Sequence, residues 1–376
     1  MSRGASTASA AATAPAAGGE WGKVFSDLLT GGHLTRAQCH WAMAEIVGGR
    51  ATDAQLAAFL VGLRAKGETA DEVIGLVEAM LEASVPLPYE GAALDIVGTG
   101  GDRSHSVNIS TLAAIVAAAA GAVVIKHGNR AASSTCGSAD VLEELGVVID
   151  LGPEGVLTCV DRVGIGFCFA PVFHPAMRYA GPVRKQLGVP TIFNILGPMA
   201  NPAQPAASLI GASDATLAPL MAEVFSGREL QAMVVRGLDG LDEVTVGGPT
   251  DVWDDTDAGV RVARVDPGAA GIDRHDPALL VGGDAPANAA VVRSVLAGAG
   301  TDDADHRMAA VRAAVLLNAG LGLVVWDAAV GEGRYGSVLD EPADRLARAM
   351  PVAAEAIDSG RAGALLDSWI EVSSSA

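Results

Sequence analysis

Four polar stretches of this sequence carry side chains that could bind an anionic ligand or a cation. The first, DIVGTGGDRSHSVNIST (residues 95–111), places three glycines and several hydroxyl and amide side chains between two apolar runs. Glycine permits close approach of the backbone to a ligand, while Asn108, Ser110 and Thr111 offer donors and caps at a helix start. The GTGGD spacing matches neither GxGxxG nor the P-loop pattern, so neither nucleotide motif explains it. An ordinary glycine turn followed by a helix cap explains this stretch, taken alone, equally well.

The second stretch, KHGNRAASSTCGSAD (residues 126–140), follows the apolar run VVI and precedes the helical pattern VLEELG. It supplies Lys126, Arg130, several hydroxyls and two glycines. Since the carboxyl ends of parallel strands meet at one edge of a sheet, the two loops together predict an anion site there. The alternative is a solvated polar loop with no ligand.

Two further stretches add cationic and acidic groups. FAPVFHPAMRYAGPVRKQLG (residues 169–188) carries Arg178 and Arg184 six positions apart on a helical segment. The Arg184 guanidinium could clamp a planar carboxylate through two parallel hydrogen bonds, which a lysine cannot do as well. RGLDGLDEVT (residues 236–245) delivers Asp242 and Glu243 from a turn. Adjacent acids recur elsewhere in the chain, but in a loop both can face a hard cation such as Mg²⁺.

The elements that must position these stretches fall into two kinds. Between residues 21 and 84 the pattern is helical, and capping boxes begin at Thr35, Thr52 and Thr69. From Leu94 onward, strand-length apolar runs alternate with helical ones, which indicates βαβ units and a mostly parallel sheet.

The same patterns give specific elements. The run VVIDLG (residues 147–152) is one of the expected strands. Two long alanine-rich helices are expected over about 303–321 and 342–358, with two or three more strands before them. The Pro-punctuated stretch near 175–203 interrupts the alternation, so we expect it to return to the helical unit and form a hinge with it.

Composition narrows the classes of function. A formal charge of −19 argues against a broad nucleic-acid partner, because non-specific binding of phosphate backbones needs a surplus of Lys and Arg. The four cysteines show no CxxC spacing and indicate reduced, packed thiols. Residues 1–20 are rich in Ala, Ser, Thr and Gly without an apolar core, which predicts a disordered tail on a cytoplasmic protein with no membrane partner.

Taken together and in order, the four stretches closely resemble anthranilate phosphoribosyltransferases over roughly residues 21–368. The resemblance implies an α/β fold with a small N-terminal helical domain hinged to a large α/β domain, whose mostly parallel central sheet is flanked by helices. The implied division is 21–88, joined by about 175–203, for the helical domain, and 92–174 with 204–370 for the α/β domain. It also implies a homodimer that uses two Mg²⁺ ions per active site to join phosphoribosyl pyrophosphate (PRPP) to anthranilate.

The resemblance assigns roles residue by residue. It assigns the metal ions to Ser110, Asp242 and Glu243, and anthranilate to Gly98, Asn129 and Arg184. His127 and His174 receive only a lining role, and no acid or base is assigned. The residues implied around PRPP are Gly98, Gly101, Asp102, Ser106, Asn108, Ile109, Ser110, Thr111, Lys126, His127, Gly128, Asn129, Arg130, Ala131, Ala132, Ser133, Ser134 and Ser138.

Two other interpretations share this architecture. A pyrimidine nucleoside phosphorylase also acts at ribose C1′, but its phosphate loop differs from GTGGD and KHGNRAASS and it lacks the acidic LDE pair. A nucleic-acid-binding relative without transferase activity conflicts with the charge of −19.

Overall fold

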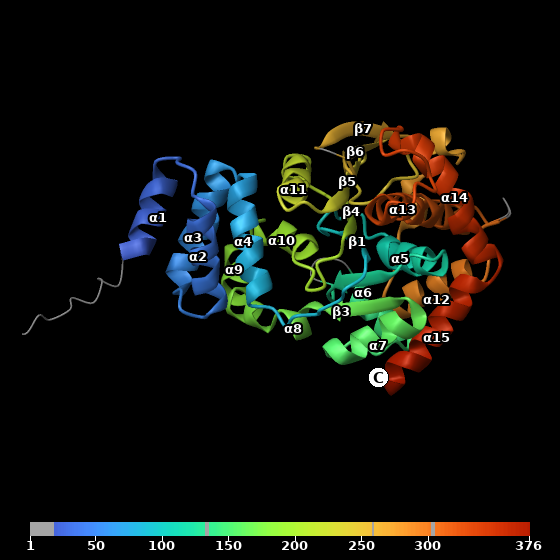
Figure 1. Cartoon of the computed structure of the whole chain (residues 1–376), viewed down its shortest axis with the longest axis horizontal. Helices are drawn as coiled ribbons and strands as arrows, with labels where there is room; N and C mark the ends of the chain where they lie inside the picture. Colours follow the sequence, from blue (N-terminus) through green and yellow to red (C-terminus); the bar gives the residue numbers. More distant parts are fainter. Residues whose placement is uncertain (1–18, 132–134, 258, 302–304) are drawn as a thin grey trace, which may run out of the picture.

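The computed structural model describes residues 19–131, 135–257, 259–301 and 305–376. Figure 1 shows two parts, a helical unit formed by the N-terminal helices and a larger α/β unit that holds the sheet and the C-terminal helices. This arrangement agrees with the predicted fold class. The predicted tail extends two residues too far, because Gly19 and Glu20 already belong to the first helix.

The helical unit begins with four helices, α1 (Gly19–Leu29), α2 (Arg36–Val47), α3 (Asp53–Lys66) and α4 (Ala70–Glu82). The three predicted capping boxes start α2, α3 and α4. A buried ion pair joins two of these helices. Lys66 Nζ lies 2.8 Å from Glu72 Oε2, and the other Glu72 oxygen accepts the Leu34 N–H at 2.7 Å. The local caps therefore define the helices, and the ion pair fixes α3 against α4.

The segment near residues 175–200 packs with this bundle. It forms η1 (Pro175–Tyr179), α9 (Gly181–Leu187) and α10 (Phe193–Met199), and Val183 and Leu196 are buried in the same apolar cluster as α2, α3 and α4. The expected return of the chain to the helical unit is consistent with this packing. The exact domain boundaries and the hinge remain predictions.

The sheet is mostly parallel, as predicted. Its strand order is β3-β2-β1-β4-β5-β6-β7; neighbours among the first five pair in parallel, whereas β6 pairs antiparallel with both β5 and β7. Because the chain runs outward from β1 to β3 and then returns to the other side of β1, the switch point lies between β1 and β4, where such sheets bind ligands. The strands are β1 (Leu94–Gly98), β2 (Val124–Gly128), β3 (Ile165–Phe169), β4 (Ala207–Gly211), β5 (Gln231–Gly237), β6 (Thr250–Asp255) and β7 (Arg261–Val265).

Both faces of the sheet are covered. Along β5, Met233 and Val235 join the core formed with the C-terminal helices, whereas Ala232 and Val234 join the core shared with the bundle. The helices of the larger unit are α5 (Ile109–Ala119), α6 (Ser138–Leu145), α7 (Pro153–Val163), α8 (Ala170–Phe173), α11 (Leu217–Ser226), α12 (Ala285–Leu296), α13 (His306–Val330), α14 (Pro342–Asp358) and α15 (Arg361–Ser375), with short turns η2 (Pro267–Ala270) and η3 (Pro277–Leu280).

Three details differ from the sequence expectations. The run 147–152 is not a strand; Val147 and Ile149 are buried, but the Val148 N–H donates to the Ser373 hydroxyl at 3.1 Å instead of to a ladder. Strand β3 lies further along the chain and was not predicted. Helix α13 continues nine residues beyond its expected end and is long and apolar enough to cross a membrane, yet 94% of its apolar window is buried inside the protein.

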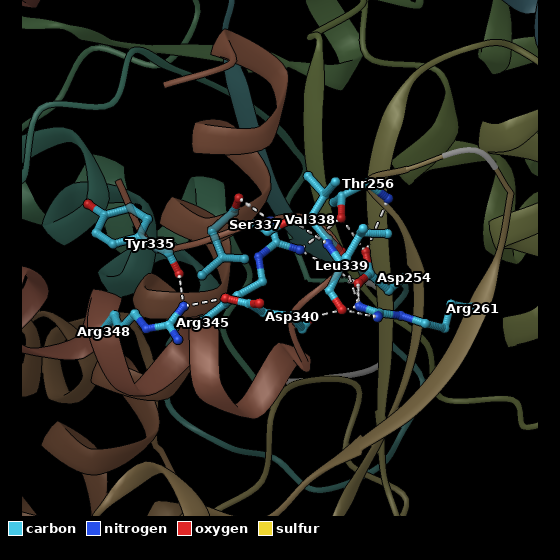
Figure 2. Close-up of polar contacts among 11 residues, drawn as sticks. Asp254, Thr256, Arg261, Tyr335, Ser337, Val338, Leu339, Asp340, Arg345 and Arg348 are labelled. Atoms are coloured by element: carbon cyan, nitrogen blue, oxygen red, sulfur yellow. Dashed lines mark hydrogen bonds and ion pairs between the residues drawn. The ribbon is translucent and has the colours of Figure 1, made fainter. Parts of the chain in front are cut away.

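Arginines tie the loop between α13 and α14 to the antiparallel end of the sheet (Figure 2). Arg261 donates to the carbonyls of Leu339 and Asp340 at 3.0 and 2.8 Å and to Asp254 at 2.9 Å. Arg345 is 1% exposed and donates to Thr256 Oγ1 at 2.9 Å. These contacts involve none of the residues in the four polar stretches, so they stabilise the far edge of the α/β unit.

Candidate active site

One cavity of about 870 Å³ lies where β1 and β2 end, and all four polar stretches line it, together with Met80 of α4 and residues of α10. Two adjacent loops with side chains that could bind an anion were expected at this edge of the sheet. In the structure the loops after β1 and β2 both lie there. The lining includes these predicted residues: Gly98, Gly101, Asp102, Ser106, Asn108, Ser110, Thr111, Lys126, His127, Gly128, Asn129, Arg130, Ala131, Ser138, His174, Arg184, Asp242 and Glu243.

Some predicted residues are placed differently. Ile109 is 1% exposed, belongs to the apolar core and does not line the cavity, and its N–H already donates to the Val107 carbonyl at 2.7 Å. The side chain of Arg130 pairs with Asp140 at 3.1 Å and with Glu143 at 2.7 Å instead of standing free for an anion. Ala132, Ser133 and Ser134 lie outside the described residues.

Glycines let the acidic loop pack directly against two strand ends. A Cβ on Gly211, at the end of β4, would lie 1.6 Å from the Asp242 carbonyl oxygen, and one on Gly98 would lie 2.4 Å from Asp242 Oδ2. The Gly100 N–H donates to Asp242 Oδ2 at 2.6 Å. The glycine loop after β1 and the acidic loop after β5 therefore form one connected wall.

The acids of this wall repel one another in a poorly solvated place. Burial raises the pKa of Asp242 to about 7, with Asp102 adding to the effect. Burial and Asp242 together raise the pKa of Glu243 well above its usual range. The Asp102 Oδ2 atom is buried and accepts no hydrogen bond from the described residues. Such a cluster is suited to a cation, because a bound cation relieves both the repulsion and the loss of solvation.

The protein supplies only part of a metal coordination shell. Among the described residues no group of three or more His, Cys, Asp or Glu side chains is arranged to hold a metal ion by itself. Mg²⁺ commonly takes one or two carboxylates and completes its shell with water and substrate phosphate oxygens. The acid pair therefore fits Mg²⁺ bound together with a phosphorylated ligand.

Lys126 is a buried cation at the base of the cavity. Its ammonium group donates to the Ile96 carbonyl and to Ser110 Oγ, the latter at 3.3 Å. Burial lowers the pKa of Lys126, and the charges of Asp95 and Glu243 oppose that effect. Lys126 thus places its amino group beside Ser110 at the N-terminal end of α5.

Asp95 and Asn201 support this part of the site, and motif reasoning assigned neither a role. Asp95 is fully buried; its carboxylate accepts the His127 N–H at 3.3 Å and the Asn201 amide at 2.9 Å. Asn201 also donates to the Ile125 carbonyl at 2.8 Å. A polar residue inside a strand-length apolar run was the only sequence signal for Asp95.

Asn318 supports the acid pair from α13. Its side chain exchanges hydrogen bonds with the Val244 main chain, accepting at 2.9 Å and donating at 3.1 Å. This fixes the residue that directly follows Glu243. The signal for it was a single asparagine in the apolar run VLLNAGLGL, where an unpaired amide would be costly.

Two histidines that line the cavity, His127 and His174, lie next to each other with ring centroids 5.1 Å apart and ring planes tilted by 56°. His127 Nδ1 donates to the Gly197 carbonyl at 3.0 Å, and His174 Nε2 donates to the Ala200 carbonyl at 2.8 Å. Burial lowers the pKa of His127 to about 3 and also lowers that of His174, so both rings are neutral near pH 7. The His127 Nε2 atom is buried without a partner among the described atoms and carries a lone pair.

Arg184 reaches the cavity from α9. Its guanidinium lies 5.2 Å from the centroid of the Phe193 ring, and burial lowers its pKa. The described residues provide no carboxylate within ion-pair distance of it. A guanidinium held over an aromatic ring, with its donors unused, is suited to a planar carboxylate on an aromatic ligand.

Comparison with known proteins gives family matches over nearly the whole chain. Its residues 90–363 match the model described as "Glycosyl transferase family, a/b domain", and residues 23–84 match "Glycosyl transferase family, helical bundle domain". The chain is 53% identical over 356 residues to the anthranilate phosphoribosyltransferase of Acidothermus cellulolyticus, covering 95% of this chain and 96% of that one. The chain belongs to the anthranilate phosphoribosyltransferase family.

Solved anthranilate phosphoribosyltransferases confirm the architecture. The structure from Thermus thermophilus matches with a TM-score of 0.82 at 36% identity, covering 93% of this chain and 99% of that one. The Saccharomyces cerevisiae structure in complex with PRPP and Mg also gives a TM-score of 0.82, at 26% identity over 95% and 99% of the two chains. The predicted enzyme class, a glycosyltransferase, is therefore confirmed along with the predicted fold class.

Proposed function

We propose that this protein transfers the phosphoribosyl group of PRPP to the amine of anthranilate, releasing pyrophosphate. The product is N-(5-phosphoribosyl)anthranilate, and the reaction is the second step of tryptophan biosynthesis from chorismate. One observation carries the proposal: a single cavity brings together two polar loops that follow parallel strands, a buried acid pair, and an arginine that lies beside an aromatic ring and has no carboxylate partner among the described residues. These are the groups that a phosphorylated sugar, a divalent cation and an aromatic acid require.

The PRPP side of the site consists of the loops after β1 and β2. Main-chain N–H groups and hydroxyls at the start of α5, with Lys126, are donors for phosphate oxygens. Ser110, Asp242 and Glu243 would hold Mg²⁺, two ions per site by family expectation. Bound Mg²⁺ neutralises charge on the pyrophosphate leaving group. Removing one preorganised donor of this kind costs roughly 10²–10³-fold in rate.

The anthranilate side is formed by Arg184, Gly98 and Asn129. Arg184 would bind the carboxylate, while the amine points toward ribose C1′. The lone pair on His127 Nε2 can accept an amine N–H, which orients the nucleophile. Because an aryl amine is already neutral near pH 7, no strong base is needed, and a His127 pKa of about 3 makes the ring a weak one.

The chemistry we propose is a direct displacement at C1′ without a covalent intermediate. The amine attacks as the bond to pyrophosphate breaks, which predicts inversion at C1′. Closure of the helical unit on the α/β unit would bring Arg184 and its ligand toward the sugar, so that catalysis comes from proximity and electrostatics.

Anthranilate fluorescence tests the proposal directly. With PRPP and Mg²⁺ we expect the fluorescence to decay and the decay to stop when Mg²⁺ is chelated. Persistent fluorescence with folded protein would refute the proposed reaction. Turnover of a pyrimidine nucleoside with phosphate would instead identify a nucleoside phosphorylase. The homodimer and the cytoplasmic location remain predictions.

A further inference from the structure

The loop between β1 and α5 holds two non-glycine residues in the left-handed region, Arg103 at φ 63° and His105 at φ 52°. Such conformations are uncommon outside glycine and carry a cost in backbone energy. A contact accounts for His105, because its carbonyl accepts the Gly282 N–H at 2.8 Å. Within the described ranges, no hydrogen bond or ion pair of the Arg103 side chain accounts for its conformation.

Among the residues that the structure describes, Arg103 has no acidic partner. It is exposed and lines the cavity, and the described part of the chain places no carboxylate within ion-pair distance of it. By contrast, Arg130 lies on the adjacent loop and is neutralised by Asp140 and Glu143. In a chain with 44 acidic and 25 basic residues, an arginine that stays unpaired at a cavity wall is available to an anionic ligand.

The loop is tethered at the acidic end of the cavity. The Gly100 N–H donates to Asp242 Oδ2 at 2.6 Å, and the Ser104 N–H donates to Asp102 Oδ1 at 3.1 Å. The first bond connects the loop to one of the acids proposed to bind Mg²⁺, and the second is a turn within the loop; Arg103 lies between them in sequence. Arg184, proposed to bind anthranilate, comes from α9 in a different part of the chain.

We infer that Arg103 binds the pyrophosphate end of PRPP, as a phosphate-binding residue additional to those assigned from the family motifs. This inference rests on the proposed function. The exposed guanidinium offers donors to phosphate oxygens at the cavity wall, whereas Lys126, which lines the same cavity, is buried. Because the side chain is exposed, solvent and salt screen its contribution, and its effect is several-fold rather than complete.

Replacing Arg103 separates this role from a structural one. Asn and Gly both accept a positive φ, so Arg103→Asn and Arg103→Gly remove the charge without straining the backbone. We expect both to raise the KM for PRPP roughly 5–10-fold at low salt, with thermal stability equal to or above that of the wild type. Arg103→Lys keeps the charge and should retain most of the affinity.

The chain offers a matched control in Glu229, an exposed non-glycine residue at φ 57° that does not line the cavity. Glu229→Gly gives the same backbone relief and should leave the KM for PRPP unchanged. Inhibition by pyrophosphate should weaken in Arg103→Asn by the same factor as PRPP affinity, whereas inhibition by ribose 5-phosphate should not. The difference from wild type should shrink at about 0.5 M NaCl.

Three results would overturn the inference. They are an unchanged KM for PRPP, an equal loss of ribose 5-phosphate inhibition, or a fall in stability that accounts for the lost activity. Wild-type protein that fails to consume PRPP and anthranilate would instead refute the proposed function.

Discussion

At the residue scale, the site is built from charges whose neighbours decide what they can do. Arg130 and Arg184 both come from motifs that predict an anion-binding cation. Arg130 is paired with two carboxylates, whereas Arg184 has no carboxylate partner among the described residues. Similarly, adjacent acids occur at several places in the sequence, and Asp254 and Asp255 are buried as well. Asp254 is paired with Arg261 at 2.9 Å, whereas Asp242 and Glu243 line the cavity. The type of residue indicates a possible function, and its surroundings decide whether the charge is available.

Arg184→Ala should raise the KM for anthranilate by roughly 10–100-fold, because a charge-assisted, two-bond contact with the carboxylate is lost. The KM for PRPP should change far less. Arg184→Lys, which keeps the charge but not the planar fork, should fall in between. Steady-state kinetics with each substrate varied in turn measures both constants; equal effects on the two would mean that Arg184 is structural or binds a phosphate.

At the scale of elements, strand ends and loops position the chemistry. The acid pair follows β5 but packs against the ends of β1 and β4, where Gly98 and Gly211 leave no room for a side chain. Asn318 of α13 holds the residue after Glu243, and Asn201 links β1 to β2 just before β4. The location of the acids therefore depends on β1, β4 and α13 as well as on the loop after β5 that carries them.

Gly211→Ala tests this dependence. The new Cβ would meet the Asp242 carbonyl oxygen at 1.6 Å, so the acidic loop must move. We expect the free energy of unfolding to fall by about 1–3 kcal/mol, measured by thermal unfolding. We also expect kcat, measured at saturating substrates, to fall by more than the loss of folded protein explains. Gly248→Ala makes the same chemical change where no atom lies within 4 Å and should affect neither. Normal turnover in Gly211→Ala would contradict the proposed placement of the acids.

At the scale of the whole molecule, the buried acids connect function with stability. The folded-state pKa of Asp242, about 7, lies above the value of an unfolded aspartate, so the native state binds the extra proton. The stability associated with that proton is complete below about pH 4 and is lost as the pH rises through about 7. His127 and His174 act oppositely, because their lowered pKa values remove stability as the pH falls below about 6.5.

Asp242→Asn should therefore stabilise the protein while inactivating it. At about pH 8 the gain should be on the order of 2–4 kcal/mol, because the amide avoids burying a charge and can still accept the Gly100 N–H. Near pH 5 the gain should shrink, since Asp242 is protonated there. Comparing unfolding of variant and wild type at each pH cancels the contribution of the histidines.

Mg²⁺-dependent turnover should fall by roughly 10² or more in the same variant. A lower stability than wild type at the higher pH would show that the Asp242 charge is compensated within the protein itself.

The sequence by itself determined the features that depend on neighbours along the chain. Capping boxes at Thr35, Thr52 and Thr69, the alternation of strands and helices, and the four ligand-binding stretches are all local patterns. They were sufficient for the fold class and for the loops that form much of the cavity wall, but not for Met80 of α4 or the residues of α10 that also line it. Only the tertiary structure decided which of those groups is available.

The tertiary structure buried the side chain of Ile109 and paired Arg130 with acids. It also made residues 147–152 a connection instead of a strand. Three polar residues that support the site were placed by the same long-range packing: Asp95, Asn201 and Asn318. These outcomes depend on burial and on contacts between distant segments, and the free energies of buried charges and hydrogen bonds are set by such contacts and not by the order of residues.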